Sequence, residues 1–203
     1  MIQLFSGTPG SGKSLHMAAE ISHYCNHWKD RLVICNFPVN TEKFRHPERF
    51  IYLSNRNLEN PKLLLQIICD FYVDHPLKEA QIFLFIDECQ VLFNARNWRQ
   101  TSENGWLPFF SQHRKYGIDI YLVAQFDEMI DKQIRCLIEY EILHRKLTNF
   151  GFIGGLIKIF TFGDVFIAIQ RWYTINQRTG VEFFKARKKY YRIYDTFATF
   201  QDV

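Results

Sequence analysis

The feature that most constrains the fold is a glycine-rich run near the start of the chain, Gly7-Thr8-Pro9-Gly10-Ser11-Gly12-Lys13-Ser14. It matches the pattern G-x-x-x-x-G-K-[ST] at every fixed position. Glycines allow successive backbone N–H groups to wrap around a phosphate, and a helix that follows directs its positive end to the same place. An apolar stretch at 2–6 precedes the run and a helical pattern at 13–28 follows it, as a phosphate-binding loop requires.

The side chains of this loop predict a nucleoside triphosphate and a metal ion as ligands. Lys13 would reach the β- and γ-phosphate oxygens, and the hydroxyl of Ser14 would ligate Mg²⁺. We assign the binding of ATP with Mg²⁺ to the residues from Gly7 to Leu15. The sequence contains no Asn-Lys-x-Asp motif for reading guanine, which favours ATP over GTP.

Two carboxylates follow the most apolar run of the chain. Residues 82–86 are Ile-Phe-Leu-Phe-Ile, as expected for a strand buried on both faces of a parallel sheet, and Asp87 and Glu88 come next. The carboxyl ends of such strands face the crevice where ligands of open α/β sheets bind. Asp87 is predicted to contact Mg²⁺. Glu88, turned the other way by strand alternation, is predicted to polarise the water that attacks the γ-phosphate.

Apolar runs alternate with helical patterns, which predicts an α/β fold with a doubly wound parallel sheet. A glutamate directly after the aspartate is typical of the additional-strand branch of P-loop NTPases, which includes RecA-like and AAA-like proteins. The predicted strand order is 5-1-4-3-2, where strands 1 to 5 are residues 2–6, 32–37, 82–86, 118–124 and 139–144. We place this ATPase core at 1–148. A β-rich C-terminal elaboration, packed on the core, is placed at 149–203, with short strands at 158–162, 165–173 and 181–185.

Gln125 and several arginines are further candidates for catalysis. Gln125 ends the predicted strand at 118–124, where its amide could contact both the γ-phosphate and the attacking water. Enzymes of this kind often need a cation at the developing charge, and a neighbouring subunit frequently supplies it. The preferred candidates, ahead of Arg96 and Arg99, are Arg135 and Arg114.

Composition bears on location and partners. Five scattered cysteines, none in a C-x-x-C pair, indicate reduced thiols and a cytosolic location. The longest apolar stretch near the C-terminus, 150–162, is too short for a membrane span, which takes about 20 residues. Aromatic residues make up 17% of the chain, more than one small core needs, so part of them is expected to face a partner subunit.

Two blocks of residues carry a family resemblance. The first is Phe85-Ile86-Asp87-Glu88-Cys89 with the downstream segment Phe93-Asn94-Ala95-Arg96-Asn97-Trp98. The second runs from Phe110 through His113-Arg114-Lys115 to Asp131-Lys132-Gln133-Ile134-Arg135. Together with Trp172-Tyr173 and Tyr194-Asp195-Thr196 they resemble the zonular occludens toxin (Zot) family, which includes the gene I assembly ATPases of filamentous bacteriophages. The resemblance covers nearly the whole chain, and its Asn-x-Arg-x-Trp element is more specific than the phosphate loop.

The resemblance implies the N-terminal ATPase domain of an inner-membrane protein, followed by one transmembrane helix and a periplasmic domain. ATP hydrolysis would drive assembly and export of virions. The implied partners are further copies of the chain in a ring, phage coat and assembly proteins, single-stranded phage DNA, and the inner membrane through a segment absent from this sequence. The implied location is the cytoplasmic face of the inner membrane of the bacterial host, with this chain as a soluble fragment.

Other functions remain open on the sequence. The chain could bind ATP as a switch with little turnover, or it could move DNA as a translocating ATPase stimulated by single-stranded DNA. A small-molecule kinase is a further alternative, although short P-loop kinases rarely carry the Asp-Glu pair. The basic and tyrosine-rich tail at 185–192 fits a solvated helix face, acidic lipid headgroups or DNA, and the net charge of +4 does not decide between them.

Overall fold

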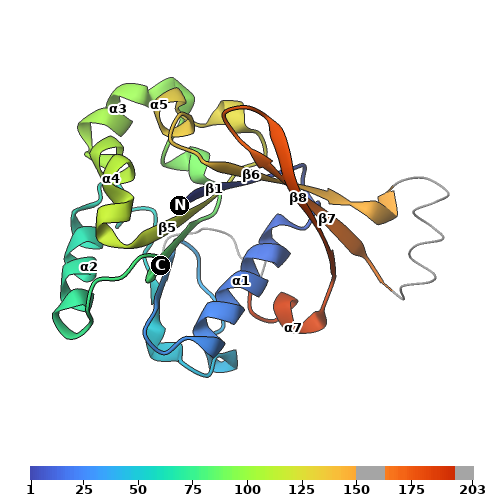
Figure 1. The fold of residues 1–203 in the computed structure, drawn as a ribbon, viewed down its shortest axis with the longest axis horizontal. Helices are drawn as coiled ribbons and strands as arrows, with labels where there is room; N and C mark the ends of the chain where they lie inside the picture. Colours follow the sequence, from blue (N-terminus) through green and yellow to red (C-terminus); the bar gives the residue numbers. More distant parts are fainter. Residues whose placement is uncertain (150–162, 195–203) are drawn as a thin grey trace.

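The computed structural model describes residues 1–149 and 163–194, which build an eight-stranded sheet with helices on both faces (Figure 1). The strand order is β3-β2-β4-β5-β1-β6-β7-β8. The strands are β1 (Ile2–Ser6), β2 (Leu32–Cys35), β3 (Phe50–Tyr52), β4 (Ile82–Ile86), β5 (Ile118–Val123), β6 (Tyr140–Lys146), β7 (Val165–Trp172) and β8 (Gln177–Lys185).

The part of the sheet from β3 to β6 is parallel throughout. The five predicted core strands lie in the order β6-β1-β5-β4-β2, so the predicted order 5-1-4-3-2 is confirmed. β5 separates β1 from β4, because it pairs Leu122 with Leu4 of β1 and Ile120 with Leu84 of β4. The carboxyl ends of β1, β5 and β4 therefore lie side by side at one edge of the sheet.

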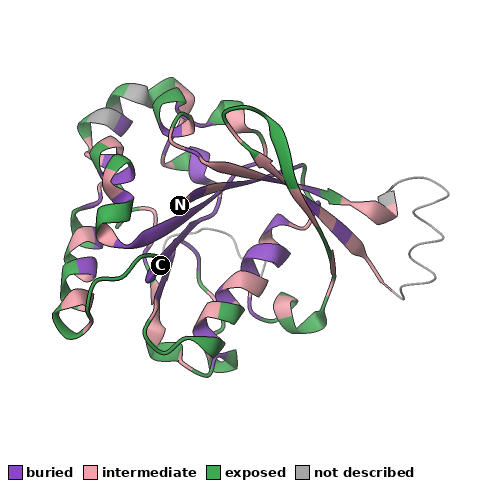
Figure 2. Cartoon of the chain, viewed as in Figure 1, coloured by how far each residue is buried: buried purple, intermediate pink, exposed green. Residues whose placement is uncertain are grey.

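Strand alternation divides the core into two layers, one on each face of the sheet. In β4, Ile82, Leu84 and Ile86 contribute to one layer, and Phe83 and Phe85 contribute to the other. All five side chains are at most 1% exposed, so β4 is buried on both faces, as its unbroken apolar run predicts. The neighbouring strand β5 is also buried along its length, and it is purple in Figure 2. Residues at the end of β4 are therefore positioned by a strand that is packed on both faces.

Helices cover both layers. α1 (Lys13–His27) packs on the layer that contains Phe83 and Phe85, while α2 (Lys62–Asp74) and α4 (Trp106–Gln112) pack on the opposite layer. The other helices of the described ranges are α3 (Trp98–Glu103), α5 (Lys132–Arg135) and α7 (Lys188–Tyr191). Short 3₁₀ turns are η1 (Thr41–Lys43), η2 (Pro47–Arg49), η3 (Cys89–Val91), η4 (Ala95–Asn97), η5 (His113–Tyr116), η6 (Asp127–Met129) and η7 (Leu147–Asn149).

The C-terminal part of the chain continues the main sheet. β7 pairs antiparallel with β6, and β8 pairs antiparallel with β7. The predicted C-terminal β-rich elaboration is therefore confirmed, while the boundary at residue 148 stays a prediction. The strand predicted at 158–162 and the apolar stretch at 150–162 lie outside the described residues. Within the ranges described, no helix has the length and apolarity needed to cross a bilayer.

Glycines at two left-handed positions offer a test of this packing. At Gly117, φ is +63°, and an added Cβ would lie 2.3 Å from the carbonyl oxygen of Lys78. At Gly10, φ is +74°, but an added Cβ would meet no atom within 4 Å. The two positions share backbone strain and differ in free space.

We predict that Gly117→Ala destabilises the protein by about 3 kcal/mol, since left-handed strain of about 1–2 kcal/mol adds to overpacking of similar size. Gly10→Ala should lower the free energy of unfolding by the left-handed strain alone, about 1–2 kcal/mol. Urea unfolding of both variants at pH 7.5 measures the difference. Equal losses in the two variants would contradict the close approach of Lys78 to Gly117.

Candidate active site

The glycine-rich loop between β1 and α1 has the local geometry of a phosphate cradle. Gly7 and Gly12 have φ of 137° and 101°, values that favour glycine. A Cβ at Gly7 would lie 2.5 Å from the carbonyl oxygen of His144, and one at Gly12 would lie 2.6 Å from the ring of Phe166. The loop is thus held against β6 on one side and β7 on the other, and only glycine fits at these two positions.

Lys13 directs its ammonium group into the loop. The side chain is 8% exposed, and Nζ donates to the carbonyl oxygens of Gly7 at 2.6 Å and Thr8 at 3.3 Å. Burial lowers the pKa of Lys13, while the charges of Glu88 and Asp87 oppose that shift. The structure therefore brings the predicted lysine within electrostatic reach of both predicted carboxylates. A bound phosphate would offer this ammonium group charged acceptors.

Asn36, just beyond the end of β2, fixes the backbone of Asp87. Its Oδ1 accepts from the backbone N–H of Asp87 at 2.7 Å, and its Nδ2 donates to the Asp87 carbonyl oxygen at 2.9 Å. The same Nδ2 donates to Oδ1 of Asn55 at 2.9 Å. Asn36 is 2% exposed, and buried polar side chains with several partners hold a fixed geometry. Asn36 was not predicted as a site residue, because its partner lies 51 positions away in the sequence.

The carboxylate of Asp87 is buried and accepts two hydrogen bonds. The backbone N–H of Glu88 donates to Oδ1 at 2.9 Å, and the phenol of Tyr194 donates to Oδ2 at 2.8 Å. Burial raises the pKa of Asp87, against the opposing effect of the Tyr194 hydrogen bond. A nearby divalent cation would favour the charged form. With the hydroxyl of Ser14 in the first turn of α1, this set of oxygen ligands fits Mg²⁺.

The direction of the Glu88 side chain is set in a different way from the one predicted. β4 ends at Ile86, and Glu88 has φ 47° and ψ 44°, so a left-handed turn, and not strand alternation, sets its direction. Its carboxylate accepts a hydrogen bond from Gln90. A non-glycine residue in this conformation is strained, and such residues cluster at active sites. Glu88 remains partly accessible at the same edge as the loop.

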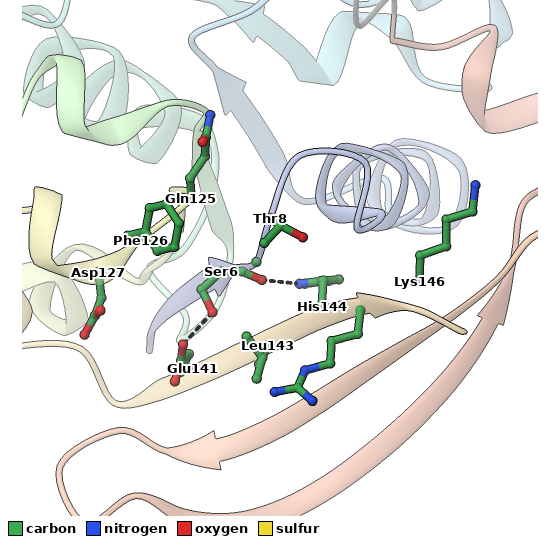
Figure 3. A pocket seen from close by; sticks show the side chains of 11 residues that line it. Ser6, Thr8, Gln125, Phe126, Asp127, Glu141, Leu143, His144 and Lys146 are labelled. Carbon is green, nitrogen blue, oxygen red and sulfur yellow. Dashed lines mark hydrogen bonds between the residues drawn. The ribbon is translucent and has the colours of Figure 1, made fainter. Parts of the chain in front are cut away.

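A pocket of about 390 Å³ opens beside the loop (Figure 3). One wall follows β5 and includes Gln125, whose carbonyl oxygen accepts from Gly7 N at 3.4 Å. The other wall is β6, where Glu141 accepts from the Ser6 hydroxyl and His144 contacts the Ser6 carbonyl oxygen, as Figure 3 shows. The contact of the Gln125 amide with the γ-phosphate and the attacking water stays a prediction, and the wall formed by β6 was not predicted. The full lining is Ser6, Gly7, Thr8, Gln125, Phe126, Asp127, Glu141, Leu143, His144, Arg145 and Lys146.

The two preferred arginines lie in different places. Arg114 precedes β5 and donates to Glu139 at 2.8 Å. Because β5 has six residues at about 3.3 Å each, Arg114 is about 20 Å from the loop edge and cannot serve the site of its own chain. Arg135 ends α5 beside Tyr173, whose phenol donates to the pocket residue Asp127 at 2.7 Å. The role of either arginine in a neighbouring subunit stays a prediction.

Two histidines form a buried pair under the loop. His16 Nδ1 and His144 Nε2 are 2.8 Å apart, and the rings are 8% and 1% exposed. Their centroids lie 5.1 Å apart, and each also packs on Phe5. Burial, followed by the neighbouring His16, lowers the pKa of His144 to about 3. His144 is therefore neutral in the folded protein across the physiological range.

The cradle of Gly7–Gly12, the lysine, the acidic pair after β4 and the intervening β5 together define a P-loop NTPase of the additional-strand branch. The family model for zonular occludens toxin (Zot) matches residues 1–201, and the chain belongs to this family. The match confirms the family that the sequence blocks around Asp87 and Arg135 resemble.

Comparisons with individual proteins agree with this family and fold. The gene 1 protein of Enterobacteria phage I2-2 is 36% identical over 83 residues, which are 39% of this chain and 23% of that protein. The N-terminal domain of zonular occludens toxin from Neisseria meningitidis matches with a TM-score of 0.53 and 19% identity, covering 96% of this chain and 98% of that chain. The genome packaging NTPase B204 of Sulfolobus turreted icosahedral virus 2, in complex with ATP-gammaS, matches with a TM-score of 0.54 and 12% identity, covering 92% and 97%. At these identities the two structural matches concern the fold.

The histidine pair predicts a pH dependence of stability. A base whose pKa falls on folding binds fewer protons folded than unfolded, so stability is lost as pH drops below about 6.5. We expect the free energy of unfolding to fall by about 2 kcal/mol between pH 7.5 and 5.0 through His144. Urea unfolding at both pH values should show this loss in the wild type and in the exposed-site control His27→Asn, and a smaller loss in His144→Asn. An unchanged pH dependence in His144→Asn would contradict the assignment.

Proposed function

We propose that the chain binds ATP with Mg²⁺ and hydrolyses it, as the motor domain of a filamentous-phage assembly and export protein. The observation that carries the proposal is the convergence of Lys13 with Asp87 and Glu88 at the carboxyl edge of the sheet, where the lysine interacts electrostatically with both carboxylates. Phosphoryl transfer needs charge stabilisation and positioning more than covalent chemistry, and this set of residues provides both.

The phosphates would lie over the N–H groups of the loop, with Lys13 at the β- and γ-phosphate oxygens. The 390 Å³ pocket is a suitable place for the nucleoside, because Phe126 and Leu143 offer apolar surface while Asp127 and Glu141 offer hydrogen-bond acceptors. Ser14 and Asp87 would hold Mg²⁺, which when bound neutralises charge on the phosphate oxygens. Glu88 would orient the attacking water, and Gln125 would contact the γ-phosphate.

The proposed biological role rests on the family and on the relatives. Gene 1 proteins of phages are among the relatives, and the sequence blocks around Asp87 and Arg135 resemble the gene I assembly ATPases of filamentous phages. We propose a homo-oligomer, as a ring, at the cytoplasmic face of the host inner membrane. Its partners would be phage coat and assembly proteins and single-stranded DNA. The match spans only 23% of the I2-2 protein, so these partners concern the longer protein.

The hydrolysis site is tested by Lys13→Ala and Glu88→Gln. Lys13→Ala should weaken nucleotide binding and abolish turnover. Glu88→Gln should retain binding and lower kcat by at least roughly 100-fold, because it removes the group that accepts the proton of the attacking water. ATP turnover and the affinity for a fluorescent ATP analogue measure the two effects. Full turnover in Glu88→Gln would show that Glu88 does not act in hydrolysis. If the wild type binds the nucleotide tightly but turns it over negligibly, the chain would be better described as a nucleotide-dependent switch.

A site shared between subunits is tested by mixing variants. If Arg135 acts in the neighbouring site, Arg135→Ala should be inactive alone and should regain turnover when mixed with Glu88→Gln, because mixed interfaces combine an intact glutamate with an intact arginine. Specific activity of the wild type should also rise with protein concentration. Arg114→Ala, assayed in parallel, distinguishes the two candidates. Concentration-independent turnover without rescue would contradict a shared site, whereas strong stimulation by single-stranded DNA would favour DNA translocation.

A further inference from the structure

Tyr194 contacts the candidate metal ligand from the far end of the described chain. Its phenol donates a hydrogen bond to Oδ2 of Asp87 at 2.8 Å, across 107 positions of sequence. The loop, the acidic pair and β5 account for the nucleotide site without this residue. The hydrogen bond from Tyr194 to the carboxylate that is expected to hold Mg²⁺ therefore needs a separate explanation.

Several contacts position this phenol. We refer to residues 186–194 as the C-terminal strap. Within it, Ile193 is 4% exposed in the core layer beneath α1, and its carbonyl oxygen accepts from the backbone N–H of Asn40 at 2.9 Å. The ring of Tyr194 packs edge-to-face on Phe37, with centroids 4.8 Å apart and an interplanar angle of 71°. Asn40 and Phe37 both lie just beyond β2, so the strap is anchored beside the end of the strand that supports Asp87 through Asn36.

The hydrogen bond suits a metal-binding carboxylate. A carboxylate offers about four acceptor positions on its two oxygens. The N–H of Glu88 takes one on Oδ1 and Tyr194 takes one on Oδ2, which leaves acceptor positions on both oxygens for a metal ion or its water ligands. The phenol and the N–H of Glu88 together fix the plane of the carboxylate, because each of its two oxygens accepts from one protein donor.

We propose that Tyr194 is a positioning residue for Asp87, and that it couples the C-terminal strap to occupancy of the Mg²⁺–nucleotide site. The inference rests on the proposed function. Coupling of this kind is reciprocal: if the docked strap strengthens binding of Mg²⁺–nucleotide, then Mg²⁺–nucleotide stabilises the docked strap by the same factor. The docking of the C-terminal strap would thereby depend on whether the nucleotide site is occupied.

The first experiment measures binding of a fluorescent ATP analogue to Tyr194→Phe, with Mg²⁺ and with EDTA. Phenylalanine keeps the ring on Phe37 and removes only the hydroxyl. We expect affinity in Mg²⁺ to fall roughly tenfold, as for loss of a hydrogen bond to a charged group, and affinity in EDTA to stay unchanged. The matched control is Tyr191→Phe, an exposed tyrosine on α7, which should bind as the wild type does under both conditions. Thermal unfolding verifies that both variants are folded.

The second experiment follows the strap directly. Lys188, Lys189 and Arg192 are exposed sites for trypsin. In the wild type and in Tyr191→Phe, saturating Mg²⁺–ATPγS should slow cleavage at these residues, as mass spectrometry of the fragments would show. In Tyr194→Phe, a concentration of Mg²⁺–ATPγS that saturates the variant should slow trypsin cleavage of the strap only slightly.

The outcomes separate this inference from the function on which it rests. Absence of analogue binding to the wild type would overturn both. Binding to the wild type in Mg²⁺ with equal affinity for Tyr194→Phe would overturn the role of Tyr194 alone. Tighter binding to Tyr194→Phe in Mg²⁺ would also overturn it, because the phenol would then compete with the metal. Equal protection of the strap in Tyr194→Phe and the wild type would overturn the coupling.

Discussion

Opposite charges buried at one edge of the sheet are the constraint on which the rest of the structure depends. Lys13 and Asp87 are 8% and 5% exposed, and removal of either would leave a charge in a poorly solvated place. Burial lowers the pKa of Lys13, and the charges of Glu88 and Asp87 oppose that shift. Burial raises the pKa of Asp87, and the hydrogen bond from Tyr194 opposes that shift, followed by the charge of Lys13. The sheet brings these groups to one edge because β5 lies between β1, which leads into the loop and Lys13, and β4, which leads into Asp87 and Glu88.

The sheet meets this requirement through contacts that extend well beyond the phosphate loop. β4 is apolar on both faces, and Asn36 joins the ends of β2 and β4 through two hydrogen bonds to the backbone of Asp87. On the other side, Phe166 of β7 packs against Gly12, so the C-terminal hairpin forms one wall of the loop. The hairpin is thus part of what shapes the cradle, although its position in the sequence suggests a separate addition.

The extent of sequence-based prediction follows from the range of each interaction. The loop residues were predictable because a fixed local motif specifies them, and central strands were predictable from unbroken apolar runs such as 82–86. The strand order was predicted from Glu88 directly after Asp87, which is typical of the additional-strand branch. β3 was missed because it has three residues with little burial, and α4 because seven residues are too few for a helical period to be distinguished. Asn36, His144 and Tyr194 were not assigned to the site because their partners lie 51, 128 and 107 positions away, where no local pattern connects them.

The two carboxylates of the site are held in different ways, and this difference matches the roles proposed for them. Asp87 has its backbone fixed by Asn36 and both carboxylate oxygens engaged by protein donors, so its orientation exists before any ligand binds. A preorganised carboxylate of this kind needs little rearrangement when a metal ion binds. Glu88 sits in a strained left-handed turn, is partly accessible, and accepts from the side chain of Gln90. A residue proposed to contact the attacking water needs this accessibility, whereas a residue proposed to hold the metal ion needs the fixed orientation of Asp87.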